Sequence, residues 1–161
     1  MSLLSMLEGL VGAKVEFVVI GGVAARAHGS PRITEDLDIC YAATTANLDR
    51  LAELLASWNA YPRGVEAGLP FIMDRRTLVT NPVLTLTTDE GALDLFDVVE
   101  GVGDFAAVSR GSVHVDGGSV QFLALDLPGL VKAKKAAARP KDLDQLPELE
   151  ALIALRRKSR G

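Results

Sequence analysis

The segment from residue 15 to residue 41, VEFVVIGGVAARAHGSPRITEDLDICY, constrains the fold of this chain more than any other. It begins with a run of β-branched and apolar residues that is typical of a buried strand. The pair Gly21–Gly22 ends this run, and an alanine-rich stretch that favours a helix follows. Residues 35–42 return to a strand pattern, although they carry Asp36 and Asp38. A strand, a short helix and a second strand in this order indicate an α/β fold.

The rest of the chain continues the alternation of helix and strand patterns. Apolar residues at helical spacing predict helices, and paired strand-like runs around turn residues predict hairpins. We therefore expect a mixed sheet flanked by helices, with further helices at the C-terminal end. Residues 61–82 show no clean period, and we expect a connector there with a short strand near Phe71. The expected helices span residues 3–13, 44–60, 126–138 and 141–158, and the expected hairpins span residues 83–99 and 111–125.

The 161 residues, 48% of them apolar, suit one domain with a substantial core. No internal repeat, low-complexity tract or linker divides the sequence. We expect a single domain over residues 1–161, with its core at 14–125 and a helical part at 126–158.

The composition also excludes several classes of protein. The single cysteine, Cys40, rules out an intrachain disulfide framework and a cysteine-based zinc cluster, and it fits a reducing compartment. No segment has the pattern of a signal peptide or the apolar length of a membrane span, so we expect a cytoplasmic protein without membrane contact. The net charge of −4 means that any contact with RNA requires a local basic patch.

Asp36 and Asp38 are two residues apart in a predicted strand, so their side chains point to the same face. Two carboxylates on one face repel each other and lose hydration when they are buried. A hard divalent cation such as Mg²⁺ relieves both costs, because it prefers oxygen ligands. A later predicted strand carries Asp94 between two leucines, and pairing it beside residues 35–41 would supply a third carboxylate.

The residues alone leave two alternatives open for these acids. Acids separated by one residue also occur on the solvent face of an edge strand, where they have no chemical role. Asp97 competes with Asp94 for the third position, but it has the opposite parity and lies nearer the end of its strand. We therefore favour Asp94.

Residues beside the acids are suited to binding phosphate. Gly21–Gly22 opens the predicted helix, where free backbone N–H groups favour anions, although plain turns also use glycine pairs. Ser30 and Arg32 lie in the loop just before the acids, and we expect them to contact a triphosphate.

The run GGVAARAHGSPRITEDLDI resembles the signature of the nucleotidyltransferase superfamily typified by DNA polymerase beta. That signature is a glycine pair at the start of a helix followed by Asp-x-Asp, and here 13 residues separate the two parts. The other residues of this run are similar to those of a small bacterial branch of the superfamily, which includes abortive-infection type toxins of toxin–antitoxin systems. The run KAKKAAARPKDLDQL resembles the same branch, in which a helical lysine precedes Arg-x-Lys-Asp at the start of the next helix.

This resemblance implies transfer of a nucleoside monophosphate from an NTP to an acceptor hydroxyl, with release of pyrophosphate. It implies that Asp36, Asp38 and Asp94 bind Mg²⁺ or Mn²⁺ and carry the catalysis. The residues that it places at or near the nucleotide are Gly21, Gly22, Arg32, Lys134 and Asp142.

Lys132 and Lys135 are the alternatives to Lys134, and all three also fit an exposed basic helix face. His28 matches a position of the family, but a lone histidine in an alanine-rich helix more often has a structural role.

The expected acceptor is an RNA end, such as that of a tRNA, with a cognate antitoxin protein as partner. The basic residues within 132–141 and 156–160 favour RNA. One alternative is adenylylation of an aminoglycoside or lincosamide antibiotic, which predicts an acidic acceptor pocket. Another is a non-catalytic nucleotide-binding module, which would not need all three acids.

Overall fold

The computed structural model describes residues 2–160 and contains a seven-stranded mixed sheet with the strand order β3-β4-β5-β2-β1-β9-β8. A separate ribbon pairs β6 with β7. The strands are β1 (Phe17–Ile20), β2 (Leu37–Tyr41), β3 (Tyr61–Pro62), β4 (Val83–Thr88), β5 (Gly91–Phe96), β6 (Val98–Val99), β7 (Gly103–Asp104), β8 (Ser112–Asp116) and β9 (Gln121–Leu125). The helices are α1 (Leu3–Gly12), α2 (Gly21–Ala27), α3 (Thr45–Ser57), α4 (Arg75–Thr80), α5 (Phe105–Arg110), α6 (Leu127–Ala137) and α7 (Pro140–Arg160). The mixed sheet with flanking and C-terminal helices is confirmed.

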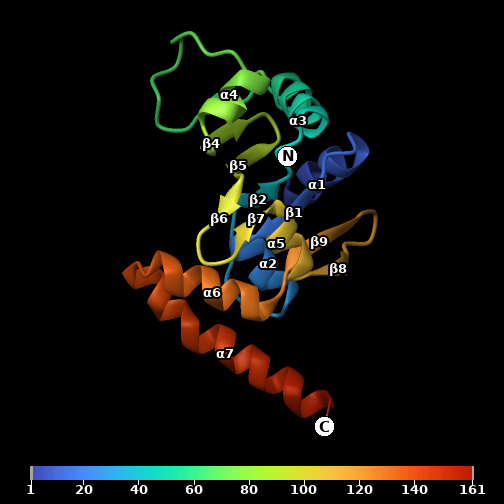
Figure 1. Cartoon of the computed structure of the whole chain (residues 1–161), viewed down its shortest axis with the longest axis vertical. Helices are drawn as coiled ribbons and strands as arrows, with labels where there is room; N and C mark the ends of the chain where they lie inside the picture. The colour runs from blue at the N-terminus through green and yellow to red at the C-terminus, as the bar shows by residue number, and fades with distance from the viewer. Residues whose placement is uncertain (1, 161) are drawn as a thin grey trace.

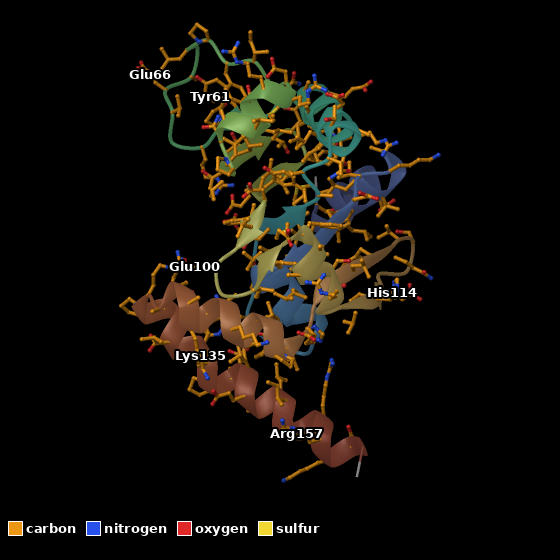
Figure 2. All side chains as sticks on the ribbon, in the orientation of Figure 1. Tyr61, Glu66, Glu100, His114, Lys135 and Arg157 are labelled. Atoms are coloured by element: carbon orange, nitrogen blue, oxygen red, sulfur yellow. The ribbon has the colours of Figure 1, made fainter. Side chains whose placement is uncertain are left out.

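The sheet spans the middle of an elongated molecule (Figure 1). Helices α3 and α4 lie at one end beside β3 and β4, and α6 and α7 lie at the other end. Figure 2 shows the same separation in side chains, with Tyr61 near one end and Lys135 and Arg157 near the other. The central strands β1, β2 and β5 therefore lie between two helical regions.

One face of β2 and β5 contributes its leucine and isoleucine side chains to the apolar core. Leu37 and Ile39 of β2 and Leu93 and Leu95 of β5 are completely buried. Because side chains alternate along a strand, the residues between them point to the opposite face. Asp38 and Asp94 are on that opposite face, so the acids can approach each other without entering the core.

Side-chain caps explain where α3 and α6 start. The Thr44 side chain accepts a hydrogen bond from the N–H of Asn47 at the start of α3, and the Asp126 side chain accepts one from the N–H of Gly129 at the start of α6. Such caps satisfy backbone donors that the first helical turn leaves unpaired. Among the described residues, none of the helices has the length and apolarity needed to cross a membrane.

Three expectations from the sequence were wrong. The second strand begins at Leu37, so Asp36 lies in the preceding loop and not in the strand. Phe71 lies in no strand; its ring instead packs edge-on against Tyr61, with the ring centroids 5.8 Å apart. The hairpin predicted over 83–99 ends at Phe96, and residues 98–110, of which 100–110 were given no element in the prediction, form β6, β7 and α5.

Candidate active site

Asp38 and Asp94 lie directly opposite each other on neighbouring parallel strands. This confirms the predicted pairing of the two acid-bearing strands. The Oδ1 atoms of both residues are buried and receive no hydrogen bond from the described residues. Burial, the neighbouring charge of Asp94, a hydrogen bond shared with Asp94 and the charge of Asp36 raise the pKa of Asp38 to about 7. The structure has therefore placed negative charge where water does not solvate it.

Gly21 lies directly against the Asp38 carboxylate. It is the first residue of α2 and has a φ of +66°, a conformation that side-chain-bearing residues rarely adopt. A Cβ atom at Gly21 would overlap the carboxylate of Asp38. Glycine is thus required here both by the backbone and by the space that remains beside the acid.

Asp36 stands apart from the other two acids. It is exposed in the loop before β2, and its charge reaches Asp38 without direct contact. Among residues 2–160, no three Asp, Glu, His or Cys side chains are arranged to hold a metal ion together. The expected three-acid cluster is therefore present only as a pair, Asp38 with Asp94.

Arg63 was missed by the sequence analysis, because it lies in a segment without clear periodicity. Its Nη2 atom is 2.9 Å from Asp94 Oδ1, although the angle does not make this ion pair a hydrogen bond. The same nitrogen donates to the carbonyl of Leu86 at 2.7 Å. Only the pairing of β3 with β4 brings Arg63 to Asp94, so no local sequence signal could have found it.

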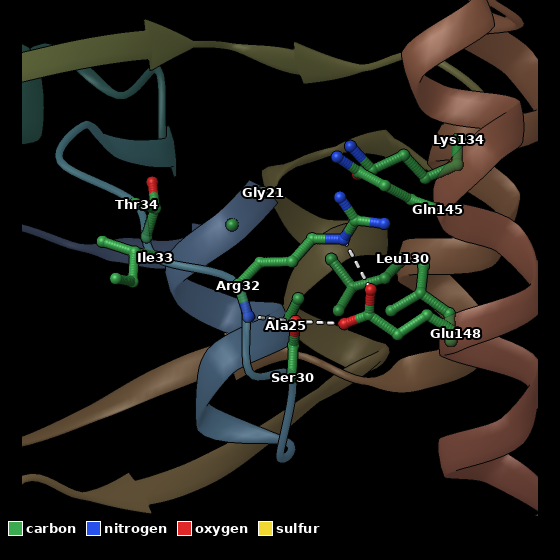
Figure 3. Close-up of a pocket in the computed structure, with 12 residues that line it drawn as sticks. Gly21, Ala25, Ser30, Arg32, Ile33, Thr34, Leu130, Lys134, Gln145 and Glu148 are labelled. Carbon is green, nitrogen blue, oxygen red and sulfur yellow. Dashed lines mark hydrogen bonds and ion pairs between the residues drawn. The ribbon is translucent and has the colours of Figure 1, made fainter.

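A cavity of about 470 Å³ lies between α2, the loop that follows it and the C-terminal helices (Figure 3). Five of the predicted nucleotide-binding residues line this cavity, as do residues of α7 that the sequence analysis did not single out. The predicted ones are Gly21, Gly22, Ser30, Arg32 and Lys134, and the additional polar ones are Thr34, Gln145 and Glu148.

Asp142 does not line this cavity; it holds Lys134 instead. Its side chain is only 1% exposed, and its two oxygens lie 3.2 Å from Lys134 Nζ and 2.7 Å from Arg139 Nε. Burial opposes the ionisation of Asp142, but hydrogen bonds from Arg139 and Lys134 outweigh it and lower the pKa of the carboxyl. Lys132 and Lys135 are exposed, so Lys134 is the lysine of α6 that lines the cavity.

A second cavity of about 430 Å³ lies beside the first. Gly21, Leu130 and Lys134 line both cavities, and Asp38 lines the second. Most other residues of its wall are apolar, with Glu100, Arg139 and Asp142 as polar exceptions. Asp38 thus lies next to the place where two cavities of substrate size meet, and Asp94 is its partner on the neighbouring strand.

The acid pair fits a hard divalent cation. Two buried carboxylate oxygens lack hydrogen-bond donors, and carboxylates are the ligands that Mg²⁺ and Mn²⁺ prefer. Asp38 and Asp94 are the residues that would hold such an ion. Asp36 would need to move or to act through bound water.

His28 has a structural role in this arrangement. It is buried, and its Nε2 atom donates to the carbonyl of Leu125 at 2.8 Å. Burial lowers the pKa of His28, which favours the neutral form. The contact ties the end of α2 to β9.

Residues 4–116 match the family described as nucleotidyl transferase AbiEii toxin, of a type IV toxin–antitoxin system. This match covers more than half of the chain. The chain belongs to the AbiEii family. The AbiEii assignment makes it a nucleotidyltransferase of a toxin family, as the sequence resemblance implied. The match includes Gly21, Gly22, Asp36, Asp38 and Asp94, and it ends before α6 and α7.

Two solved structures share the fold of this AbiEii family member. Lincosamide antibiotic adenylyltransferase LnuA, with lincomycin bound, has a TM-score of 0.60 at 13% identity; the alignment covers 94% of this chain and 96% of LnuA. A candidate nucleotidyltransferase from Thermotoga maritima has a TM-score of 0.53 at 15% identity, covering 97% of this chain and 91% of that protein. At these identities the likeness concerns the fold. No similar protein was found among curated sequences.

Proposed function

We propose that this nucleotidyltransferase moves a nucleoside monophosphate from an NTP to an acceptor hydroxyl and releases pyrophosphate. The observation that supports this most is the pairing of Asp38 with Asp94 next to the junction of two cavities. In the reaction, the hydroxyl oxygen bonds to the α-phosphorus, and the bond from that phosphorus to the bridging oxygen of the β-phosphate breaks. This transfer requires acids near the reacting phosphorus and cations near the leaving pyrophosphate.

The acids have separate parts in this proposal. Mg²⁺ or Mn²⁺ bound by Asp38 and Asp94, with Asp36 as third ligand, would neutralise phosphate charge and lower the pKa of the acceptor hydroxyl. Asp94 accepts the hydroxyl proton on its carboxylate, whose buried Oδ1 atom receives no hydrogen bond from the described residues although Arg63 Nη2 lies 2.9 Å away.

The first cavity takes the nucleotide. Gly21 and Gly22 leave room for phosphates beside Asp38, and Arg32 and Lys134 supply positive charge along the cavity wall. Asp142 acts through Lys134, because it contacts that lysine and does not line the cavity.

An RNA end, such as that of a tRNA, is the acceptor that we propose, with a cognate antitoxin as protein partner. Exposed cations on the two C-terminal helices and in the turn between them support an RNA backbone contact. They are Lys132, Lys135, Arg139, Lys141, Arg156, Arg157 and Lys158. We place the protein in the cytoplasm, where NTPs and tRNA occur and where the buried free thiol of Cys40 stays reduced.

The second cavity supports another candidate function, the modification of a small hydroxylated antibiotic. Its size and largely apolar wall suit the body of such a molecule, and Glu100 gives it an acidic group. An acidic acceptor pocket is what the sequence analysis expected for drug-modifying enzymes.

The test is incubation of the protein with each α-³²P-labelled NTP and Mg²⁺, together with total tRNA or with a panel of aminoglycosides and lincosamides. We expect label to move to tRNA, and Asp38→Asn and Asp94→Asn to reduce transfer by about 1,000-fold. Asp97→Asn serves as the control, because Asp97 stands outside the acid pair and is expected to keep the activity.

The outcomes separate the proposals. Transfer only to an antibiotic would replace the RNA acceptor by the small-molecule acceptor. Equal transfer by wild type and Asp38→Asn, or none to any acceptor, would refute the proposed function. Loss of activity in Asp97→Asn with retention in Asp94→Asn would exchange the roles of these two acids.

A further inference from the structure

The C-terminal helix α7 reaches the proposed nucleotide cavity through Glu148. One oxygen of this carboxylate accepts a hydrogen bond from the Ser30 hydroxyl, and the other accepts one from Arg32 Nε at 2.5 Å. Ser30 is buried, and the Glu148 side chain is 22% exposed. Hydrogen bonds from Ser30 and Arg32 lower the pKa of Glu148, so this carboxyl group is ionised at neutral pH.

The contact with Glu148 uses only part of the Arg32 guanidinium. Nε is engaged, whereas neither terminal nitrogen has a hydrogen-bond partner among the described residues. In Figure 3 the end of the guanidinium is turned toward Lys134 and Gln145, across the cavity. Arginine binds phosphate best through two parallel N–H groups, and its terminal nitrogens are the ones that remain available here.

The backbone of Arg32 is fixed as well. Its N–H donates to the Ser30 hydroxyl oxygen at 3.3 Å, and its carbonyl accepts from Arg26 Nη1 at 3.4 Å. The Ser30 hydroxyl proton is already donated to Glu148, so this proton is not available to a nucleotide. Ser30 therefore serves as a connection between the loop and α7, which differs from the direct triphosphate contact predicted from the sequence.

Helix α7 also supplies an acid to Lys134, the other cation of the cavity. Asp142 of α7 contacts Lys134 as Glu148 contacts Arg32. Each cation thus has one acid of α7 as its anchor. A carboxylate that blocked the cavity would occupy the terminal nitrogens of Arg32; Glu148 instead leaves them open.

We propose that Glu148 is a positioning residue for nucleotide binding, which holds Arg32 by Nε so that its terminal nitrogens meet the triphosphate. The inference rests on the proposed function, since it assumes an NTP in this cavity. It concerns a part of the chain outside the matched AbiEii region, which ends at residue 116.

The test uses full-length protein and α,β-methylene analogues of all four NTPs, which bind but cannot transfer the nucleotide. Their dissociation constants are measured by calorimetry for wild type, Glu148→Gln, Arg32→Ala and the double variant. We expect Glu148→Gln to weaken binding about 10-fold, as for the loss of one charge-assisted contact. In the Arg32→Ala background, Glu148→Gln should have no further effect, because Glu148 acts through Arg32.

The control is Glu150→Gln, an equal change of charge at an exposed position of the same helix, and it should bind like wild type. In turnover, Glu148→Gln should raise the KM for the NTP and leave kcat nearly unchanged. Thermal melting establishes that each variant is folded.

Three other outcomes would each contradict either the positioning role of Glu148 or the proposed function. If wild type binds an analogue and Glu148→Gln binds it equally well, the positioning role is wrong and the proposed function stands. If the effect of Glu148→Gln persists undiminished without Arg32, Glu148 supports only the docking of α7, and the positioning role is wrong. If wild type binds none of the analogues, the proposed function itself fails.

Discussion

Asp142 is a buried aspartate whose carboxylate pairs with cationic side chains on two sides. Its carboxylate lies between Lys134 and Arg139, and the pairing keeps it ionised in spite of its burial. When one member of a buried ion pair is removed, the remaining charge has no partner. The stability lost in this way exceeds the stability that the intact pair contributes. The side chain therefore affects stability as well as the placement of Lys134.

We predict that Asp142→Asn lowers the free energy of unfolding at pH 7 by about 3 kcal/mol. Because the pKa of Asp142 is lower in the folded protein than its ordinary 3.8, its charge stabilises the fold above that value. This contribution is lost as the pH falls through the folded pKa. Urea unfolding at several pH values should therefore show the difference between variant and wild type shrinking below pH 4 or so.

Asp144→Asn, at an exposed position of the same helix, should change little at any pH. A difference between Asp142→Asn and wild type that stays constant down to pH 3 would show that the charge of Asp142 is not its source.

The single residues also show what sequence patterns can and cannot reveal. Asp94 was found because the alternation of side chains along a strand is a local property. Asp36 was misplaced because the strand starts at Leu37, two residues later than its composition suggested. Arg63 could not be found at all, since its contact with Asp94 depends on a pairing between segments more than 20 residues apart.

At the scale of elements, Asn47 connects α3 to the start of β1 and the end of β2. Its side-chain oxygen accepts from the N–H of Glu16 at 2.7 Å, and its amide nitrogen donates to the carbonyls of Glu16 and Ala42 at 3.0 and 2.7 Å. The side chain is only 1% exposed. This buried amide therefore satisfies the Glu16 N–H and the Ala42 carbonyl, and it adds a second donor to the Glu16 carbonyl, which already accepts from the Ala42 N–H at 3.2 Å.

We predict that Asn47→Ala destabilises the protein by about 2–4 kcal/mol, because it leaves the Glu16 N–H and the Ala42 carbonyl without their partner and removes one of the two donors to the Glu16 carbonyl. Urea unfolding monitored by circular dichroism measures the change. Arg50→Ala, on the exposed face of the same helix, is the control and should fall within about 0.5 kcal/mol of wild type. A loss below about 1 kcal/mol in Asn47→Ala would mean that water replaces the amide.

Long helices were easier to predict from the sequence than short ones. Helix α3 shows its apolar period over several turns, and α6 has both a capping aspartate and an early proline, so both were recognised. Helices α4 and α5 have six residues each, too few to display a period, although Asp74 and Asp104 cap them. A capping aspartate alone is also common in turns, which is why these two helices were missed.

At the scale of the whole molecule, polar contacts of Glu148 join the C-terminal helices to the loop before β2. Glu148 of α7 accepts hydrogen bonds from Ser30 and Arg32 of that loop. Leu130 and Leu149 of these helices belong to the same apolar core as the strands. The helical part therefore has no separate core of its own.

We predict that the chain unfolds in one transition, as a single domain over residues 1–161. Calorimetric and van't Hoff enthalpies should agree to within about 10%, since a two-state transition requires their equality. Near-UV and far-UV circular dichroism should give the same midpoint. Two resolved transitions would instead separate the helical part at 126–158 from the sheet.

The two edges of the seven-stranded sheet differ in what they offer to another chain. Strand β3 has only two residues, and Pro62 has no N–H to donate to an incoming strand. Strand β8 has five residues without proline, and its Val113 is exposed. Only one side of this sheet can therefore be extended. Edge-to-edge association of partly unfolded chains would join β8 to β8 and stop at two copies, because neither copy has a second edge from which a fibre could grow.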